Sequence, residues 1–307
     1  MIAQDLERDP FIPQSEDAAA APYGAALLDA LEVALSDYVV FPSRAHARAV
    51  TLWVATTHAI AAFDYAPRLV VRSAENRSGK SRLLEVIDAT CHDPLRAVNA
   101  TVSAIFRSLE DQPPPTLLLD EADTIFGSRK VAENNEDLRG LLNAGYQRGL
   151  PVLRTVGPQH TPTRFNTFAM AALAGIGAMP DTIEDRALVV VMRRRKPTEA
   201  VKPYRLRRDQ PRLHALRDRM ASWAQGELEA LRDAMPEMPL EDRAADTWEP
   251  LIAVADAAGG HWSATARQVA LQLTEEAEAA AVSDSTNVRL LEDIKGVFEI
   301  SGPFIPS

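Results

Sequence analysis

Between residues 69 and 192, short β-rich runs alternate with segments of helical periodicity, and this alternation constrains the fold more than any other feature of the sequence. The β-rich runs cover residues 69–72, 116–120, 152–156, 168–173 and 188–192. Apolar strands separated by helices are typical of a parallel sheet covered by helices on both faces. The sequence therefore predicts an α/β fold.

Segments with helical periodicity alone flank this region on both sides. They cover residues 23–37 and 44–62 before it, and 213–231, 242–257 and 263–281 after it. Residues 1–21 lack periodicity, which indicates a flexible leader. We expect a leader at 1–21, an N-terminal helical element at 22–64, an α/β domain at 65–197, a C-terminal helical lid at 198–282, and a tail at 283–307 that begins a further helix and a further module.

Composition is typical of a cytoplasmic globular protein. Of the 307 residues, 46% are hydrophobic and 25% are charged, as in ordinary soluble domains. No apolar run is long enough to span a bilayer, and the acidic start of the chain differs from a secretory signal, so we expect no membrane partner. The single cysteine, Cys91, excludes an internal disulfide and a multi-cysteine metal site, and we expect it to be a small buried side chain.

The net charge of −10 argues against a surface covered in positive potential. Arginine is nevertheless dense at residues 193–196 and 205–208. These two clusters fit either a basic groove for nucleic acid or a solvated basic face beside acidic helices.

The segment SAENRSGKS, residues 73–81, lies between an apolar run and a helical segment at 82–89. In a strand–loop–helix of this kind, backbone N–H groups at the start of the helix point at an anion such as a phosphate. Lys80 would reach the β and γ phosphates of ATP, and the Ser81 hydroxyl would bind Mg²⁺. Ala74 stands where the usual pattern has Gly, which is tolerable unless that position needs a positive φ. The predicted nucleotide-binding residues of this loop are Ala74, Glu75, Asn76, Arg77, Ser78, Gly79, Lys80, Ser81 and Arg82.

About forty residues further on, the segment PTLLLDEAD, residues 115–123, is an apolar run that ends in two carboxylates. A central parallel strand has its C-terminal end at the edge where nucleotides bind. Asp120 would orient Mg²⁺ through water, and Glu121 would polarise the water that attacks the γ phosphate. The same two acids can instead cap the next helix. Together with the loop, they predict Mg²⁺-dependent ATP hydrolysis.

The order of these motifs, their spacing and the helical domain that follows resemble the AAA+ branch of P-loop ATPases. More narrowly, several strings resemble an uncharacterised family, catalogued as domain of unknown function 3631, of actinobacterial chromosomes, plasmids and phages. The strings are SAENRSGKSRLLEV, TLLLDEADTIFG, LRGLLNAGYQRG, ALAGIGAMPDTIEDRALVV and DRAADTWEPLIAVADAAGG. We expect the resemblance to cover residues 23–275. It implies a replicative, helicase-like ATPase that forms a homo-oligomeric ring such as a hexamer, together with replication partner proteins.

The resemblance also assigns roles to two arginines. Arg186 precedes the run at 188–192, where such ATPases place an arginine that reaches the neighbouring subunit's γ phosphate. A surface pair of Asp185 with Arg186 explains the same residues. Arg243, which opens a helix of the lid, is the candidate for a second sensor arginine.

One position departs from the family pattern, because the run at 168–173 should end in a polar residue that positions the attacking water. The sequence there continues Ala-Gly and offers none. Either Asn143 or another group replaces it, or hydrolysis is slow.

Residues 150–168, LPVLRTVGPQHTPTRFNTF, contain two β-like runs around a Gly-Pro turn. An inserted hairpin here resembles the pore hairpin of ring helicases, whose basic residues contact single-stranded DNA. Arg154, His160 and Arg164 would be those contacts, and binding would weaken with salt. A plain connecting hairpin is the alternative.

Two classes of function therefore remain open. The first is a ring-forming helicase or DNA-remodelling motor of a phage, plasmid or mobile element. The second is an ATP-gated assembly scaffold or regulator, which includes an anti-phage defence ATPase with a partner protein. The apolar end of the run at 168–173 and the acidic net charge favour the second class.

Overall fold

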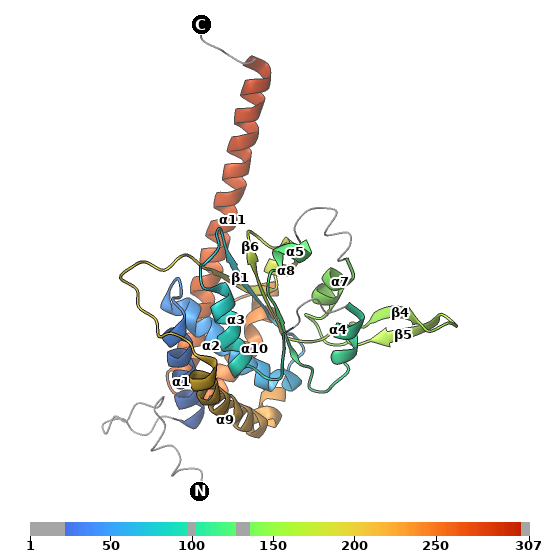
Figure 1. Cartoon of the computed structure of the whole chain (residues 1–307), viewed down its shortest axis with the longest axis vertical. Coiled ribbons are helices and arrows are strands. Elements are labelled where there is room, and N and C mark those ends of the chain that lie inside the picture. The colour runs from blue at the N-terminus through green and yellow to red at the C-terminus, as the bar shows by residue number, and fades with distance from the viewer. Residues whose placement is uncertain (1–21, 97–101, 127–135, 302–307) are drawn as a thin grey trace.

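A sheet of five parallel strands lies at the centre of the computed structural model, which describes residues 22–96, 102–126 and 136–301 (Figure 1). The strand order is β2-β3-β6-β1-β7. The bounds of these strands are β1 Arg68–Ser73, β2 Pro94–Arg96, β3 Thr116–Leu119, β6 Ala171–Ile176 and β7 Ala187–Val191. This arrangement confirms the predicted α/β fold with a parallel sheet flanked by helices.

Strand β1 lies in the middle of the sheet, between β6 and β7. Arg68 is in register with Ala171 of β6 and with Ala187 of β7. All the pairings are parallel, so the strands end at one edge, here called the C-terminal edge, and begin at the opposite, N-terminal edge. The three inner strands β1, β3 and β6 are almost wholly buried, which explains their largely apolar sequence.

The two faces of the sheet belong to two hydrophobic cores. Leu69 and Val71 of β1 point into the larger core, whereas Val70 between them points into the smaller one, as expected for side chains that alternate along a strand. The larger core contains α3 (Lys80–Thr90). The smaller core contains residues of α4 (Val102–Ser108), α7 (Glu136–Ala144) and α8 (Asp181–Glu184), and Phe126 at the end of α5 (Asp123–Phe126) packs against it.

The helices that flank the sheet in sequence pack together into one body, which shares the larger core with the sheet. They are α1 (Tyr23–Tyr38), α2 (Arg44–Ala59) with the 3-10 turn η2 (Ile60–Ala62), α9 (Leu206–Arg232), α10 (Asp242–Ala258) and α11 (Trp262–Ser301). Gly24 of α1 shows how closely they approach, because an added Cβ would lie 2.7 Å from the Ala258 Cα and 2.9 Å from the Trp223 ring. The N-terminal helices thus pack directly against the predicted lid.

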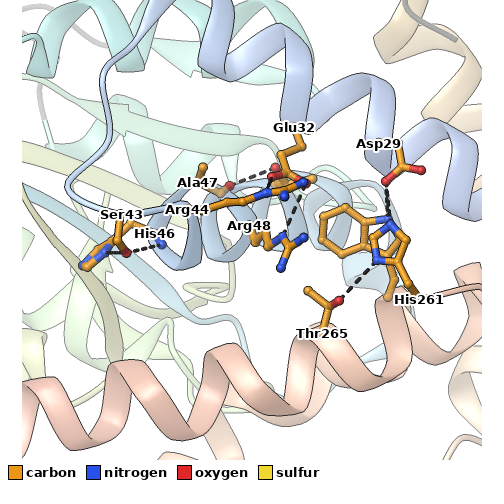
Figure 2. A network of polar contacts seen from close by, with 11 residues as sticks. Asp29, Glu32, Ser43, Arg44, His46, Ala47, Arg48, His261 and Thr265 are labelled. Carbon is orange, nitrogen blue, oxygen red and sulfur yellow. Dashed lines mark hydrogen bonds and ion pairs between the residues drawn. The ribbon is translucent and has the colours of Figure 1, made fainter. Parts of the chain in front are cut away.

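A polar network also ties α1 and α2 to the start of α11 (Figure 2). Asp29 Oδ1 lies 2.9 Å from His261 Nε2 and accepts a 3.0 Å hydrogen bond from Trp262 Nε1. On the neighbouring turn of α1, Glu32 pairs with Arg44 Nε at 2.7 Å and with Arg48 Nε at 3.5 Å. The contacts of Asp29 join segments more than 200 residues apart in the sequence, whereas those of Glu32 join α1 to α2.

Strands β4 (Val152–Val156) and β5 (Thr161–Phe165) form a separate antiparallel hairpin that projects from the sheet (Figure 1). The predicted hairpin is therefore confirmed, and residues 152–156 are not part of the central sheet. The turn contains Gly157 and His160, both with positive φ.

Two helices differ from the sequence-based expectation. Helix α9 begins at Leu206 rather than 213, and Pro211 lies within it. Helix α11 is continuous over 40 residues, although we expected a break between 281 and 287. Residues 282–286, Val-Ser-Asp-Ser-Thr, include neither Gly nor Pro, so no strong helix breaker ends the helix there. Its last turns extend away from the rest of the molecule (Figure 1). None of the helices within the described residues has the length and hydropathy needed to cross a bilayer.

Candidate functional site

The loops after β1, β3 and β6 meet in a cleft of about 540 Å³ at the C-terminal edge of the sheet. The cleft is lined by Asn76, Arg77, Ser78, Gly79, Lys80, Ser81, Arg82, Asp120, Glu121, Asp123, Gly175 and Ile176. The structure therefore brings most of the predicted loop and both predicted acids to one place.

The loop between β1 and α3 turns through two residues with positive φ, Arg77 (62°) and Gly79 (95°). Gly79 is the N-cap of α3. An added Cβ there would meet only Met192 Cε, at 3.5 Å, so backbone conformation rather than space favours glycine at this position. Ala74 has no such backbone requirement, which explains why the loop tolerates alanine at that position.

Lys80, the first residue of α3, folds its side chain back over the loop. Its ammonium donates to Ser73 Oγ at 2.6 Å, to Ser78 Oγ at 3.4 Å and to the Glu75 carbonyl oxygen at 3.5 Å. In the described part of the chain these partners are all neutral oxygens. Among the described residues, no carboxylate forms a salt bridge with Lys80, and an anion in the cleft would supply a counter-charge.

The two predicted acids lie where β3 leaves the sheet. Asp120 Oδ1 accepts a 3.0 Å hydrogen bond from the Glu121 backbone N–H, and Asp120 Oδ2 lies 3.8 Å from Arg96 Nη2. Glu121 has a φ of 56°, and the ladder to β6 resumes one residue later, where Ala122 N–H donates to the Ala174 carbonyl at 2.7 Å. Glu121 therefore bulges out of the strand into an exposed position, whereas Ala122 is buried.

A third carboxylate, Asp123, also lines the cleft, although the sequence motifs assign it no role. Its Oδ1 accepts a 3.0 Å hydrogen bond from the backbone N–H of Ile176, the last residue of β6. The only signal in the sequence was its place two residues after Glu121, in the quoted segment at 115–123.

The basic run at 193–196 lies beside the loop at residues 73–81, which is the predicted phosphate-binding loop. Arg194 Nε lies 2.9 Å from Glu75 Oε2 and donates to the Asn76 carbonyl at 3.1 Å. Arg193 holds Glu199 through two hydrogen bonds, and these hydrogen bonds lower the pKa of Glu199 to about 2. Two of the arginines are thus engaged in local ion pairs.

Arg186 lies at the opposite, N-terminal edge of the sheet. Its carbonyl accepts a 2.9 Å hydrogen bond from Arg68 N–H at the start of β1. Its guanidinium donates to the Thr182 carbonyl and lies over the Tyr146 ring, 5.7 Å from the centroid.

Arg243 Nη1 lies 3.1 Å from Asp185 Oδ2. Both residues line a second hollow of about 600 Å³, together with Asp242 and Asp246. The structure therefore does not bring Arg243 to the cleft, and it pairs Asp185 with Arg243 rather than with Arg186.

β6 lacks the polar residue that the resemblance to AAA+ ATPases predicts at its end, since its sequence is Ala-Ala-Leu-Ala-Gly-Ile. Asn143 lies on α7 and is not among the residues that line the cleft. Its Oδ1 is buried and has no hydrogen-bond partner in the described residues. Asn143 therefore does not fill the missing position.

The three predicted DNA contacts are not gathered on one surface. Arg154 Nη2 lies 2.5 Å from Asp137 Oδ1 of α7, and its guanidinium lies 5.5 Å from the Phe106 ring centroid. Arg164 is exposed and pairs across the hairpin with Leu153, so the two side chains lie on the same face. Arg154 is the next residue after Leu153 and therefore points to the other face. His160 lies in the turn.

The donor set of the cleft suits a hard cation held jointly with a ligand. Within residues 22–96, 102–126 and 136–301, no cluster of three His, Cys, Asp or Glu side chains could hold a metal ion alone. The Ser81 hydroxyl and the Asp120 carboxylate both line the cleft. Mg²⁺ typically takes one or two protein oxygens of this kind and completes its shell with phosphates and water.

Comparison with known proteins finds similarity to a family model and to a curated protein. The model of a family described as "Protein of unknown function (DUF3631)" matches residues 191–304. A curated protein of Saccharopolyspora erythraea, described as "Uncharacterized 28.9 kDa protein in xis 5'region", is 52% identical over 107 residues, which are 35% of this chain and 40% of that protein. The aligned region is thus less than half of that relative.

The family match begins at the last residue of β7 and covers α9, α10 and α11. We expected the resemblance to cover residues 23–275, and the match instead lies over the C-terminal helices, so residues 73–186, which include the cleft, are outside it. Residues 191–304 therefore match the model of a family of unknown function.

Proposed function

We propose that this chain is a Mg²⁺-dependent ATPase of the P-loop, AAA+-like type. One observation supports the proposal most strongly. The Lys80 ammonium, whose partners among the described residues are neutral oxygens, lines the same cleft as the two acids Asp120 and Glu121, at the C-terminal edge of a parallel sheet. Ligands of open parallel sheets bind at this edge.

Binding of the triphosphate would rest on the loop and on α3. The loop ends at the N-terminus of α3, an eleven-residue helix whose dipole and first N–H groups attract an anion. Lys80 would exchange its contacts with Ser73, Ser78 and the Glu75 carbonyl for phosphate oxygens. Ser81 and Asp120 would hold Mg²⁺, which neutralises charge on the β and γ phosphates when bound.

Hydrolysis would use Glu121, which bulges out of β3 and is exposed at the cleft. Its carboxylate would take a proton from the attacking water as the water oxygen bonds to the γ phosphorus. The bond between the γ phosphorus and the bridging oxygen of ADP breaks in the same reaction. The products are ADP and inorganic phosphate.

Arg186 supports the proposal of a homo-oligomer. It lies at the start of β7, while the cleft lies beyond the end of β1, and six residues of strand separate the two edges by about 20 Å. Arg186 would therefore serve the cleft of a neighbouring subunit rather than its own. Addition of Arg186→Ala chains to wild-type chains should lower turnover per wild-type chain, and unchanged turnover would contradict this role.

The motor and the scaffold remain the two candidate uses of ATP. The salt bridge of Arg154 with Asp137 and the apolar end of β6 favour an ATP-gated scaffold or regulator, including a defence ATPase. The projecting hairpin, with Arg164 exposed, favours a motor that contacts single-stranded DNA. Stimulation of turnover by single-stranded DNA would support the motor. ATP-dependent assembly without such stimulation would support the scaffold.

The direct test of the proposed activity is phosphate release by the full-length chain, wild type and variants. Lys80→Ala and Glu121→Gln should each abolish most of the MgATP hydrolysis. Lys196→Ala and Glu229→Gln are matched controls, because both side chains are exposed and outside the cleft, and they should hydrolyse ATP at the wild-type rate. Hydrolysis by Lys80→Ala and Glu121→Gln at the wild-type rate would contradict the assigned roles.

A further inference from the structure

The end of β6 presents a defect for the proposed ATPase, because it carries no polar side chain where the attacking water must be held. Its last residues are Gly175 and Ile176, and both line the cleft. The backbone N–H of Ile176 does not point at free space, since it donates to Asp123 Oδ1 at 3.0 Å. A carboxylate from the β3 side thus occupies the position beside the end of β6.

The local backbone is shaped to place Asp123 there. Glu121 has a positive φ, the ladder to β6 resumes at Ala122, and Asp123 follows as the first residue of α5. The bulge therefore separates Glu121 from Asp123 by one buried residue and leaves both at the cleft.

Gly175 makes room for this carboxylate. A Cβ added at residue 175 would lie 3.0 Å from Asp123 Oδ1, 2.9 Å from the Asp123 backbone N and 2.6 Å from Met179 Cε. Real Cβ atoms are not found this close to backbone atoms. The absence of a side chain at the end of β6 and the presence of Asp123 are thus two parts of one arrangement.

We propose that Asp123 is a further catalytic residue, which supplies the water-positioning group that β6 lacks. This inference rests on the proposed ATPase function. Asp123 Oδ1 is anchored by Ile176 N–H, and the described residues supply no hydrogen bond to its other oxygen, Oδ2. Oδ2 accepts one hydrogen of the attacking water, while Glu121 takes the other hydrogen as the proton that leaves when the oxygen bonds to phosphorus.

Asp123 can instead be a purely structural pin between β3 and β6. The two roles differ in what an amide does at this position. Asparagine keeps an Oδ1 acceptor for Ile176 N–H, so it preserves the pin, but it removes the negative charge and one of the two carboxylate acceptors. A structural pin is satisfied by asparagine, and a water-positioning carboxylate is not.

The test compares Asp123→Asn and Asp123→Ala with wild type in the full-length chain. Three quantities are measured: the dissociation constant for MgATP by calorimetry, kcat and KM by phosphate release, and Tm without nucleotide. Asp181→Asn is the control, because Asp181 is exposed and does not line the cleft.

For Asp123→Asn we expect an unchanged dissociation constant and an unchanged Tm, with kcat lowered about 100-fold. Asp123→Ala should lose kcat to a similar extent and also have a lower Tm, because the contact with Ile176 is lost. Asp181→Asn should match wild type in all three quantities.

Two other results overturn the inference and leave the proposed function standing. The first is hydrolysis by Asp123→Asn at the wild-type rate. The second is a lower kcat of Asp123→Asn together with weaker MgATP binding or a lower Tm, because such a loss is explained by a damaged fold or binding site. If wild type neither binds nor hydrolyses ATP, the proposed function and the inference fail together.

Discussion

The two edges of the central sheet both carry cationic side chains that donate to neutral oxygens, and they differ in whether the cation is buried in the fold or lies in an open cleft. At the N-terminal edge, Arg68 is fully buried and donates to the carbonyls of Ala66, Leu142 and Ala169. Arg148 donates in the same way to Ile60 and Phe63. At the C-terminal edge, the ammonium of Lys80 lies in an open cleft among neutral loop oxygens.

This difference separates cations that hold the fold from a cation that can bind a ligand. A guanidinium saturated by backbone carbonyls has no free donor for an anion, and removing it leaves those carbonyls unpaired. An ammonium that folds back over a loop can turn outward toward a phosphate at little cost. The role of a cationic residue therefore depends on its hydrogen-bond acceptors and its exposure, and the sequence shows neither.

The largest effect should be kinetic and at the C-terminal edge. Glu121→Gln should lower kcat for MgATP about 1,000-fold, equivalent to about 4 kcal/mol of transition-state stabilisation, because the amide cannot accept the proton of the attacking water. Its unfolding free energy in urea should match wild type, since Glu121 is exposed. A large loss of unfolding free energy in this variant would contradict the claim that Glu121 acts in catalysis and not in holding the fold.

The opposite result is expected for Arg68→Met at the N-terminal edge. Burial lowers the pKa of Arg68 to about 9, yet its donors pair three carbonyls that water cannot reach. Their loss should reduce the free energy of unfolding by about 3 kcal/mol, measured by urea titration. Arg195→Met, in the exposed linker, is the control and should change it little. A variant of Arg68 within about 1 kcal/mol of wild type would show that this buried cation does not hold the fold.

A smaller effect should depend on pH. Burial lowers the pKa of His58 to about 4, below its ordinary 6.5. Its Nε2–H donates to the Thr90 carbonyl at 2.8 Å, and its Nδ1 is buried without a partner in the described residues. The unfolded chain therefore takes up the proton first, so the stability that neutral His58 contributes is complete above pH 6.5 and is lost as the pH falls toward 4.

Between pH 7 and pH 5 this linkage should lower the free energy of unfolding by about 2 kcal/mol. The measurement is a urea titration at both pH values for wild type and for His58→Gln, which keeps a donor for Thr90 and cannot titrate. The difference between the two proteins isolates His58. An equal pH dependence in both would contradict the burial of a neutral imidazole.

The smallest effect should come from Arg194. Its pair with Glu75 is about half exposed on both sides, and exposed pairs of this kind contribute less than about 1 kcal/mol. Arg194→Ala should change the dissociation constant for MgATP by no more than about threefold, measured by calorimetry. A loss of tenfold or more would place Arg194 in the binding machinery and extend the cleft to the basic run at 193–196.

Much of the sheet was predictable because its strands are continuous apolar runs. β1 and β7 lie within one residue of the prediction, and β3 differs only at its last residue. The short strand β2 was missed, since three residues carry no periodicity. β6 lies three residues later than expected, because Ala-Ala-Leu-Ala-Gly has a weaker strand signal than the Phe-Ala-Met that precedes it.

The candidate site was predictable only where the order of strands and loops along the chain decides which residues meet. The loop at 73–81 and the acids at 120 and 121 follow strands of the same sheet, so their meeting at one edge follows from parallel topology. Asp123 was not predictable, because its placement depends on the bulge at Glu121. The pair of Arg243 with Asp185, 58 residues apart, depends on how the helices pack on the sheet, and no local pattern shows it.

The measurement that most directly tests the central claim is isothermal titration of MgATP into the full-length chain, its Lys80→Ala variant and its Lys196→Ala variant. We expect saturable heat with one site per chain for wild type and for Lys196→Ala, and no measurable heat for Lys80→Ala. No heat with wild type, or equal binding by Lys80→Ala, would contradict the claim that the ammonium of Lys80 and the acids at the end of β3 form one nucleotide site.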